Sequence, residues 1–261
     1  MTFINDLSPI MLSIGPVEIR WYGMFFAIGL FLSYSVLLKI FKKENLPLKD
    51  LDSLVIFLFV GLLVGARAGH ILFYNFEYFS QNPSEILKIW HGGLASHGAA
   101  IGLLVAYTLF VFIKKVNFSK YVDLLSIVTP ITAGFVRLGN FFNSEIYGKP
   151  THTTYGVIFK RLGEDFPRHP SQIYESLIAF SIFGIMLLLY KTAYRKLPKM
   201  FLLFTFVFLY FTSRFLVEYF KDRVAESDIY FLSKGQILSI LPIAISLIYF
   251  GYITFRKFRT K

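Results

Sequence analysis

Seven long apolar segments constrain this 261-residue chain more than any other feature of its sequence. Each segment is close to the roughly 20 residues that an α-helix needs to cross the hydrocarbon core of a bilayer. The apolar runs predict helices over residues 19–40, 53–74, 93–113, 121–141, 172–190, 200–219 and 236–255. We therefore predict an all-α, polytopic membrane protein with seven transmembrane helices.

The composition agrees with this prediction. Only 16% of the residues are charged and 55% are hydrophobic, whereas a soluble domain carries about 25% charged residues. The chain shows no internal repeat and no low-complexity linker, so we expect a single seven-helix membrane domain over residues 1–261. The first 16 residues lack a basic region, so we expect no cleaved signal peptide. The absence of cysteine excludes disulfides, a thiolate nucleophile supplied by this chain and cysteine-based metal sites.

The distribution of lysine and arginine predicts the orientation in the membrane. Fifteen of the 27 basic residues fall in regions 39–49, 114–120, 191–199 and 256–261, which would all lie on one side of the bilayer. The positive-inside rule makes that side cytoplasmic. We therefore expect the N-terminus outside, the C-terminus in the cytoplasm and an extracytoplasmic loop at about 142–171. The net charge of +11 is then explained by topology, and we expect no nucleic-acid partner.

Polar residues from six of the seven segments are expected at one depth, just below the outer surface. The sixth segment contributes three of them at i, i+4 and i+8, which places them on one helical face. Ionisable groups within a membrane are expensive and mark functional sites. The members of this outer polar layer are Arg20, Tyr22, Arg67, His97, Arg137, Glu175, Tyr210, Arg214 and Glu218.

The densest polar motif lies at the end of the fourth segment, between Gly134 and Gly148. Arg137 and Asn140 are three residues apart and would share a helical face. Asn143 and Glu145 follow directly. At Gly148, which ends the motif, the lack of a side chain would allow the backbone to approach a ligand closely. The motif predicts a helix that ends by presenting hydrogen-bond donors to an anion.

Each of these residues also has a structural interpretation. An arginine near a helix end can extend its charge to the membrane interface. Arg214 and Glu218 could form an i, i+4 ion pair. Tyr22 and Tyr210 could be interfacial aromatics, and His97 could be a packing residue. The shared depth of the group favours the functional interpretation over these alternatives.

Small residues dominate the run from Trp90 to Gly102. They favour close packing of helices, which would account for Gly98 and Gly102. His91 and His97 are six residues apart, and no H-E-x-x-H motif occurs, so we expect no metal site. Nothing in the sequence indicates another cofactor.

The segment from Arg168 to Glu175 predicts the start of the fifth helix. Ser171 is a candidate N-cap, since its hydroxyl could accept a backbone hydrogen bond from the first turn. Gln172 and Glu175 would then face the outer polar layer.

Taken in order along nearly the whole chain, the motifs resemble the prolipoprotein diacylglyceryl transferase family. The matching motifs are R-W-Y-G-M around Tyr22, G-A-R-A-G-H-I-L-F-Y-N (65–75), G-G-L-A-S-H-G (92–98), R-L-G-N-F-F-N-S-E-I-Y-G (137–148), H-P-S-Q-I-Y-E (169–175), S-R-F-L-V-E-Y-F (213–220) and G-Q-I-L-S-I (235–240). The resemblance implies a bacterial plasma-membrane enzyme with seven helices and a site toward the outer face. Its reaction would transfer the diacylglyceryl group of phosphatidylglycerol to the lipobox cysteine of a preprolipoprotein signal peptide, with release of glycerol 1-phosphate.

The resemblance also implies residue roles. Arg137 and Arg214 match phosphate-binding arginines, and His97 and Tyr210 match positions at the reaction centre. We place the remaining motif residues in the predicted lipid site: Tyr22, Asn140, Asn143, Glu145, Gly148 and Glu218. Of these, Asn140, Asn143 and Glu145 either contact the head group or hold Arg137 in place.

The implied chemistry requires two tasks. Charge grows on a departing phosphate, which arginines bind bidentately, and the substrate thiol must lose its proton because the thiolate is the nucleophile. His97 is the natural base, and Tyr210 is a weaker candidate because a free tyrosine has a pKa of about 10. The field of the arginines alone is a third possibility. A transporter is the competing class, but the charges stop at one depth and no repeat is visible.

Overall fold

The computed structural model describes residues 3–15, 17–88, 92–222 and 232–259. Within these residues, seven helices are long and apolar enough to cross a membrane, which confirms the predicted all-α, polytopic membrane fold. They are α1 (Trp21–Lys43), α2 (Leu48–Tyr74), α4 (Ser96–Lys114), α5 (Phe118–Phe142), α6 (Ser171–Ala193), α7 (Phe201–Val217) and α8 (Lys234–Arg259).

Short elements that the sequence did not predict lie between these helices and before them. At the N-terminus, β1 (Phe3–Asn5) pairs in parallel with β4 (Val157–Phe159), and β2 (Ile10–Ile14) pairs antiparallel with β3 (Val17–Arg20). The predicted loop after α2 contains the helix α3 (Phe76–Gln81) and a 3-10 turn at Pro83–Leu87. Strands this short give too little alternation to be recognised in a sequence.

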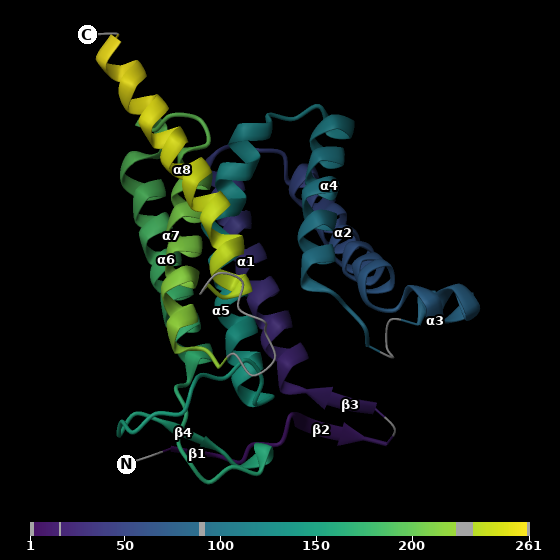
Figure 1. Ribbon diagram of the computed structural model, residues 1–261. Helices are drawn as coiled ribbons and strands as arrows, with labels where there is room; N and C mark the ends of the chain where they lie inside the picture. The colour runs from purple at the N-terminus through teal and green to yellow at the C-terminus, as the bar shows by residue number, and fades with distance from the viewer. Residues whose placement is uncertain (1–2, 16, 89–91, 223–231, 260–261) are drawn as a thin grey trace. The chain divides into compact units, whose positions relative to one another are not determined.

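The chain divides into two compact units. The larger holds the described residues of Met1–Leu37 and Val122–Lys261, and the smaller is Leu38–Tyr121. The expectation of one membrane domain stays a prediction. In the larger unit α6 packs against α7 and α7 against α8 (Figure 1). Ser33 of α1 donates a hydrogen bond to the carbonyl of Val128 in α5 at 3.1 Å.

The smaller unit is built on the contact between α2 and α4. A Cβ added at Gly65 would lie 2.4 Å from the carbonyl oxygen of Gly98, and one at Gly102 would lie 2.1 Å from that of Gly61. Only glycine permits two backbones to approach this closely. The predicted packing role of Gly98 and Gly102 is therefore confirmed.

Arg67 lies in the smaller unit and holds the chain that precedes α4. It is buried, and its guanidinium donates hydrogen bonds to backbone carbonyls at Glu85 (2.6 Å), Ile86 (3.0 Å) and Gly92 (2.5 Å). Charged donors to carbonyls form strong hydrogen bonds. Arg67 therefore neither extends to an interface nor stands free for a ligand: it fixes the loop that leads to His97.

Arg168 plays the same part in the loop between α5 and α6. It forms ion pairs with Glu164 (2.5 Å) and Asp222, and its Nη1 donates to the carbonyl of Gly148 at 3.2 Å. The hydrogen bond to Glu164, followed by that to Asp222, raises the pKa of Arg168 above its ordinary value. The charge on this side chain is therefore permanent, and it joins three segments of chain that lie far apart in the sequence.

Asp123 of α5 caps the first turn of α7 from a distance. Its buried carboxylate accepts hydrogen bonds from the backbone N–H groups of Met200 (2.8 Å) and Leu203 (2.9 Å). A carboxylate at a helix N-terminus satisfies N–H groups that lack a partner within the helix and interacts favourably with the helix dipole.

Replacing this cap should destabilise the larger unit. Asp123→Ala leaves two backbone N–H groups without an acceptor, so we expect a loss of about 1–2 kcal/mol. The measurement is the Tm of the detergent-solubilised protein. Asp165→Asn, which alters an exposed carboxylate, serves as the control and should leave the Tm unchanged. Equal Tm values for Asp123→Ala and the unmodified protein would show that the cap contributes nothing.

Candidate active site

The end of α5 carries a chain of side-chain hydrogen bonds. Arg137 Nη1 donates to Asn140 Oδ1 at 3.2 Å, and Asn140 Nδ2 donates in turn to Glu145 Oε2 at 3.2 Å. Asn143 Nδ2 donates to Glu145 Oε1, also at 3.2 Å. The predicted common face of Arg137 and Asn140 is thus confirmed. These amides hold Arg137 and Glu145 in place, and any contact of theirs with a lipid stays a prediction.

A tight turn follows α5 and is anchored by α6. Ser144 and Ile146 both have a φ of 55°, in the left-handed region. Gln172 Nε2 donates to the carbonyl of Glu145 at 2.6 Å, and the Ser171 hydroxyl donates to the carbonyl of Ile146 at 2.8 Å. The prediction of Ser171 as N-cap is wrong, because Pro170 occupies that position and the Ser171 hydroxyl serves the turn instead.

Gly148 lies where three segments of backbone meet. Its N–H donates to the carbonyl of His169 at 2.8 Å, and it forms an antiparallel bridge with Lys221. A Cβ at this position would lie 2.5 Å from the oxygen of His169 and 2.6 Å from that of Phe220. Close backbone packing therefore accounts for glycine here, and a direct contact with lipid stays a prediction.

Tyr22 packs against α5 at Gly139. A Cβ at Gly139 would lie 3.1 Å from the Cα of Tyr22, so the two helices approach closely at this level. Tyr22 is half-buried. This contact brings the first residues of α1 to the polar end of α5.

Four charged groups that are largely shielded from solvent form a network beside this turn. Arg137 Nε lies 3.0 Å from Glu175 Oε2 in α6, and Lys221 Nζ lies 2.8 Å from Glu175 Oε1. Lys221 Nζ also lies 3.5 Å from Glu218 Oε2. The four side chains are 10–16% exposed. At this burial, charges interact far more strongly than on a surface.

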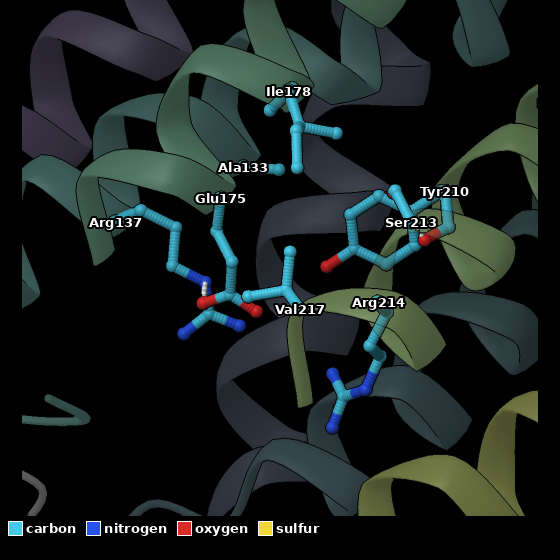
Figure 2. A pocket seen from close by; sticks show the side chains of 9 residues that line it. Ala133, Arg137, Glu175, Ile178, Tyr210, Ser213, Arg214 and Val217 are labelled. Atoms are coloured by element: carbon cyan, nitrogen blue, oxygen red, sulfur yellow. Dashed lines mark hydrogen bonds and ion pairs between the residues drawn. The ribbon is translucent and has the colours of Figure 1, made fainter. Parts of the chain in front are cut away.

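Two arginines line one narrow pocket in the larger unit. Arg137 and Glu175 meet on one side of it, and Tyr210 and Arg214 of α7 lie on the other (Figure 2). The pocket holds about 320 Å³ of empty space, including its open mouth. The remaining lining residues are Ala133, Ile178, Ala179, Ser213 and Val217.

Arg214 is the less neutralised of the two arginines. Within the described residues it forms no ion pair, and its buried Nε has no hydrogen-bond partner. The alternative of an Arg214–Glu218 pair is not observed among these residues, because α7 ends at Val217 and Glu218 turns toward Lys221. A buried donor without an acceptor is unfavourable, so this position favours an anionic ligand.

The predicted site residues are thus partly assembled. The larger unit brings together Arg137, Tyr210 and Arg214 around the pocket, with Asn140, Asn143, Glu145, Gly148 and Glu218 in the adjoining network. His97 is exposed in the first turn of α4, in the other unit, and its role stays a prediction. Trp90 and His91 lie outside the described residues.

Sequence reasoning missed Lys221 and gave Glu175 only a general position in the polar layer. Lys221 directly follows the 3-10 turn Glu218–Phe220, which comes after α7. A lysine at such a position is typical of a solvent-exposed loop. The i, i+3 spacing of Glu218 and Lys221 was the one available signal for a pairing at this position.

Comparison with known proteins places the chain in a family. The family model described as "Prolipoprotein diacylglyceryl transferase" matches residues 9–252. Proteins named phosphatidylglycerol–prolipoprotein diacylglyceryl transferase are similar to it: that of Tolumonas auensis is 44% identical over 92% of this chain and 93% of its own length. That of Chloroherpeton thalassium is 41% identical (93% and 91%), and that of Geobacter sulfurreducens 33% identical (89% and 90%). The chain is therefore a member of the prolipoprotein diacylglyceryl transferase family.

Proposed function

We propose that this protein transfers the diacylglyceryl group of phosphatidylglycerol to the lipobox cysteine thiol of preprolipoproteins. The reaction forms a thioether, releases glycerol 1-phosphate and is the first step of bacterial lipoprotein maturation. Family membership and the names of the relatives support this activity. The observation that carries it is the pocket lined by two arginines, one of them without a carboxylate partner among the described residues.

The pocket suits the stabilisation of a leaving phosphate. The thiolate sulfur attacks a glycerol carbon, the carbon–oxygen bond to phosphate breaks, and the bonding electrons leave with the phosphate. Negative charge therefore grows on the phosphate oxygens in the transition state. Arg137 and Arg214 supply preorganised donors at the place where that charge develops, and electrostatic stabilisation of this kind usually contributes more to catalysis than any other effect.

The thiol proton requires an acceptor, and His97 is our candidate. His97→Asn removes the base while keeping a polar side chain of similar shape, so we expect kcat to fall by about 10²–10⁴. The measurement is turnover at pH 6–8 in detergent. His152→Asn, at an exposed loop position, serves as the control. Turnover of His97→Asn equal to that of the unmodified protein across this range would assign deprotonation to Tyr210 or to the arginine field.

Family membership supports a location in the bacterial plasma membrane, and the distribution of charge supports a site on its extracytoplasmic side. The basic regions at 39–49, 114–120, 191–199 and 256–261 would face the cytoplasm. Arg137 and Arg214 lie toward the opposite ends of α5 and α7 from the flanking basic regions at 114–120 and 191–199.

A reconstituted transfer assay tests the function. Purified protein, vesicles containing phosphatidylglycerol and a lipobox peptide should yield a lipidated peptide and an equal amount of glycerol 1-phosphate. A peptide with serine in place of cysteine should give neither product, because the hydroxyl is a much weaker nucleophile at neutral pH. Absence of both products with the cysteine peptide, in protein that binds phosphatidylglycerol, would refute the transferase and favour the transporter class.

A further inference from the structure

Glu175 lies between two cations that have different positions relative to the pocket. Its Oε2 faces Arg137 Nε at 3.0 Å, and its Oε1 faces Lys221 Nζ at 2.8 Å. Arg137 and Glu175 both line the pocket. Among the described residues, Lys221 is not part of the pocket lining. One carboxylate therefore bridges a cation inside the pocket and a cation beside it.

The contact with Arg137 is a charge contact without an aligned hydrogen bond. Although Oε2 lies 3.0 Å from Nε, this buried oxygen has no hydrogen-bond partner among the described residues. An ion pair without hydrogen-bond alignment is weaker than a bidentate one. Arg137 thus retains its capacity to bind an anion that offers better geometry.

The local charge balance favours replacement of this contact. Arg137 and Lys221 are matched by Glu175 and Glu218 within the network, and Arg214 adds one positive charge at the pocket. A phosphodiester brings one negative charge and would give Arg214 an anionic partner. Glu145, the next carboxylate among the described residues, reaches Arg137 only through the amide of Asn140. The same phosphate placed against Arg137 would repel the carboxylate of Glu175 across a poorly solvated pocket.

We propose that Glu175 is the resting counter-ion of Arg137 and that the lipid phosphate displaces it, leaving the carboxylate held by Lys221. Glu175 and Lys221 are then positioning residues that act through Arg137. The inference rests on the proposed function only in taking the anion to be the phosphate of the lipid and of the glycerol 1-phosphate product. The site then has a second state, in which Arg137 has exchanged the carboxylate of Glu175 for a phosphate.

The first test is the sign of the effect of Glu175→Gln. Glutamine keeps the shape but removes the competing charge, so the Kd for glycerol 1-phosphate should fall about fivefold or more. The measurement is isothermal titration of the full-length protein in detergent, with the KM for phosphatidylglycerol expected to fall in parallel. A residue that merely holds Arg137 in place would give the opposite sign, so an unchanged or higher Kd overturns the proposal.

The second test is the dependence of one substitution on the other. Lys221→Gln removes the group that receives the carboxylate of Glu175. When this substitution is made alone, the Kd for glycerol 1-phosphate should therefore rise. In the Glu175→Gln background no carboxylate needs to be received, and Lys221→Gln should then have no effect. Equal effects in both backgrounds would mean that Lys221 binds the phosphate itself, and would overturn the proposal.

Controls separate binding from folding and from turnover. Lys234→Gln, at an exposed position, should leave the Kd unchanged. If Glu175→Gln does not accumulate as a monodisperse protein, Glu175→Asp replaces it, because a shorter side chain draws the charge away from Arg137 and should lower the Kd in the same direction. Titration of glycerol 1-phosphate does not require turnover, so a failed transfer assay would refute the enzyme while leaving the exchange of anions measurable.

Discussion

Arg214→Ala is expected to lower kcat/KM for transfer by about 10³-fold or more, because it removes a preorganised donor from the departing phosphate. Arg137→Ala should have a similar effect. Arg214→Lys should restore only part of the activity, since an ammonium offers a point charge where a guanidinium offers two parallel donors. The measurement is release of glycerol 1-phosphate in the presence of a lipobox peptide.

The control for this experiment is Arg161→Ala. Arg161 is exposed in the loop between α5 and α6 and shares the charge type without lining the pocket. All variants are compared at equal amounts of folded protein in membranes. Activity of Arg214→Ala within twofold of Arg161→Ala would exclude the arginine pair as the binding site for the leaving group.

Gly148→Ala is expected to produce the largest loss of stability among single-methyl changes in the larger unit. The new Cβ would lie 2.5 Å from the carbonyl oxygen of His169 and 2.6 Å from that of Phe220. Both neighbours are backbone atoms in paired segments, so neither can rotate away. We expect a loss of about 3 kcal/mol, seen as a lower Tm and reduced accumulation in membranes.

Gly184→Ala is the matched control for this substitution. Gly184 lies in the middle of α6, and a Cβ there would meet no atom within 4 Å. Alanine has a higher helix propensity than glycine, so the Tm should stay equal or rise. A similar loss of stability in both variants would show that the effect comes from the methyl group in general and not from the junction at Gly148.

Much of the fold could be predicted from the sequence because apolar length and loop charge are local properties. The predicted segment 53–74 lies within α2, and 121–141 lies within α5. The relation between Arg137 and Asn140 was equally accessible, since i, i+3 spacing on a helix determines which side chains are neighbours. Even the start of α8 carries a visible signal: Ser233 and Gln236 exchange hydrogen bonds in a capping box.

The rest of the site depends on partners that lie far apart in the sequence. Lys221, which follows α7, pairs with Glu175 of α6. Asp123 caps α7, a helix that begins 78 residues later. Arg67 was expected to belong with Arg137 by depth, yet its guanidinium is saturated by loop carbonyls. No single-sequence pattern encodes such pairings, because they arise only when separate elements are packed together.

The bridge between Gly148 and Lys221 has a consequence for substrate choice. It joins the chain just after α5 to the chain just after α7, and the N–H of Lys149 donates to the carbonyl of Phe220 at 2.8 Å in the same junction. The helices that carry Arg137 and Arg214 are therefore held at their ends by main-chain hydrogen bonds. These hydrogen bonds fix the distance between the two helices and so the width of the space for an anion between the arginines. We therefore expect the enzyme to select lipids by the size of the phosphate-containing head group and to tolerate variation in the acyl chains.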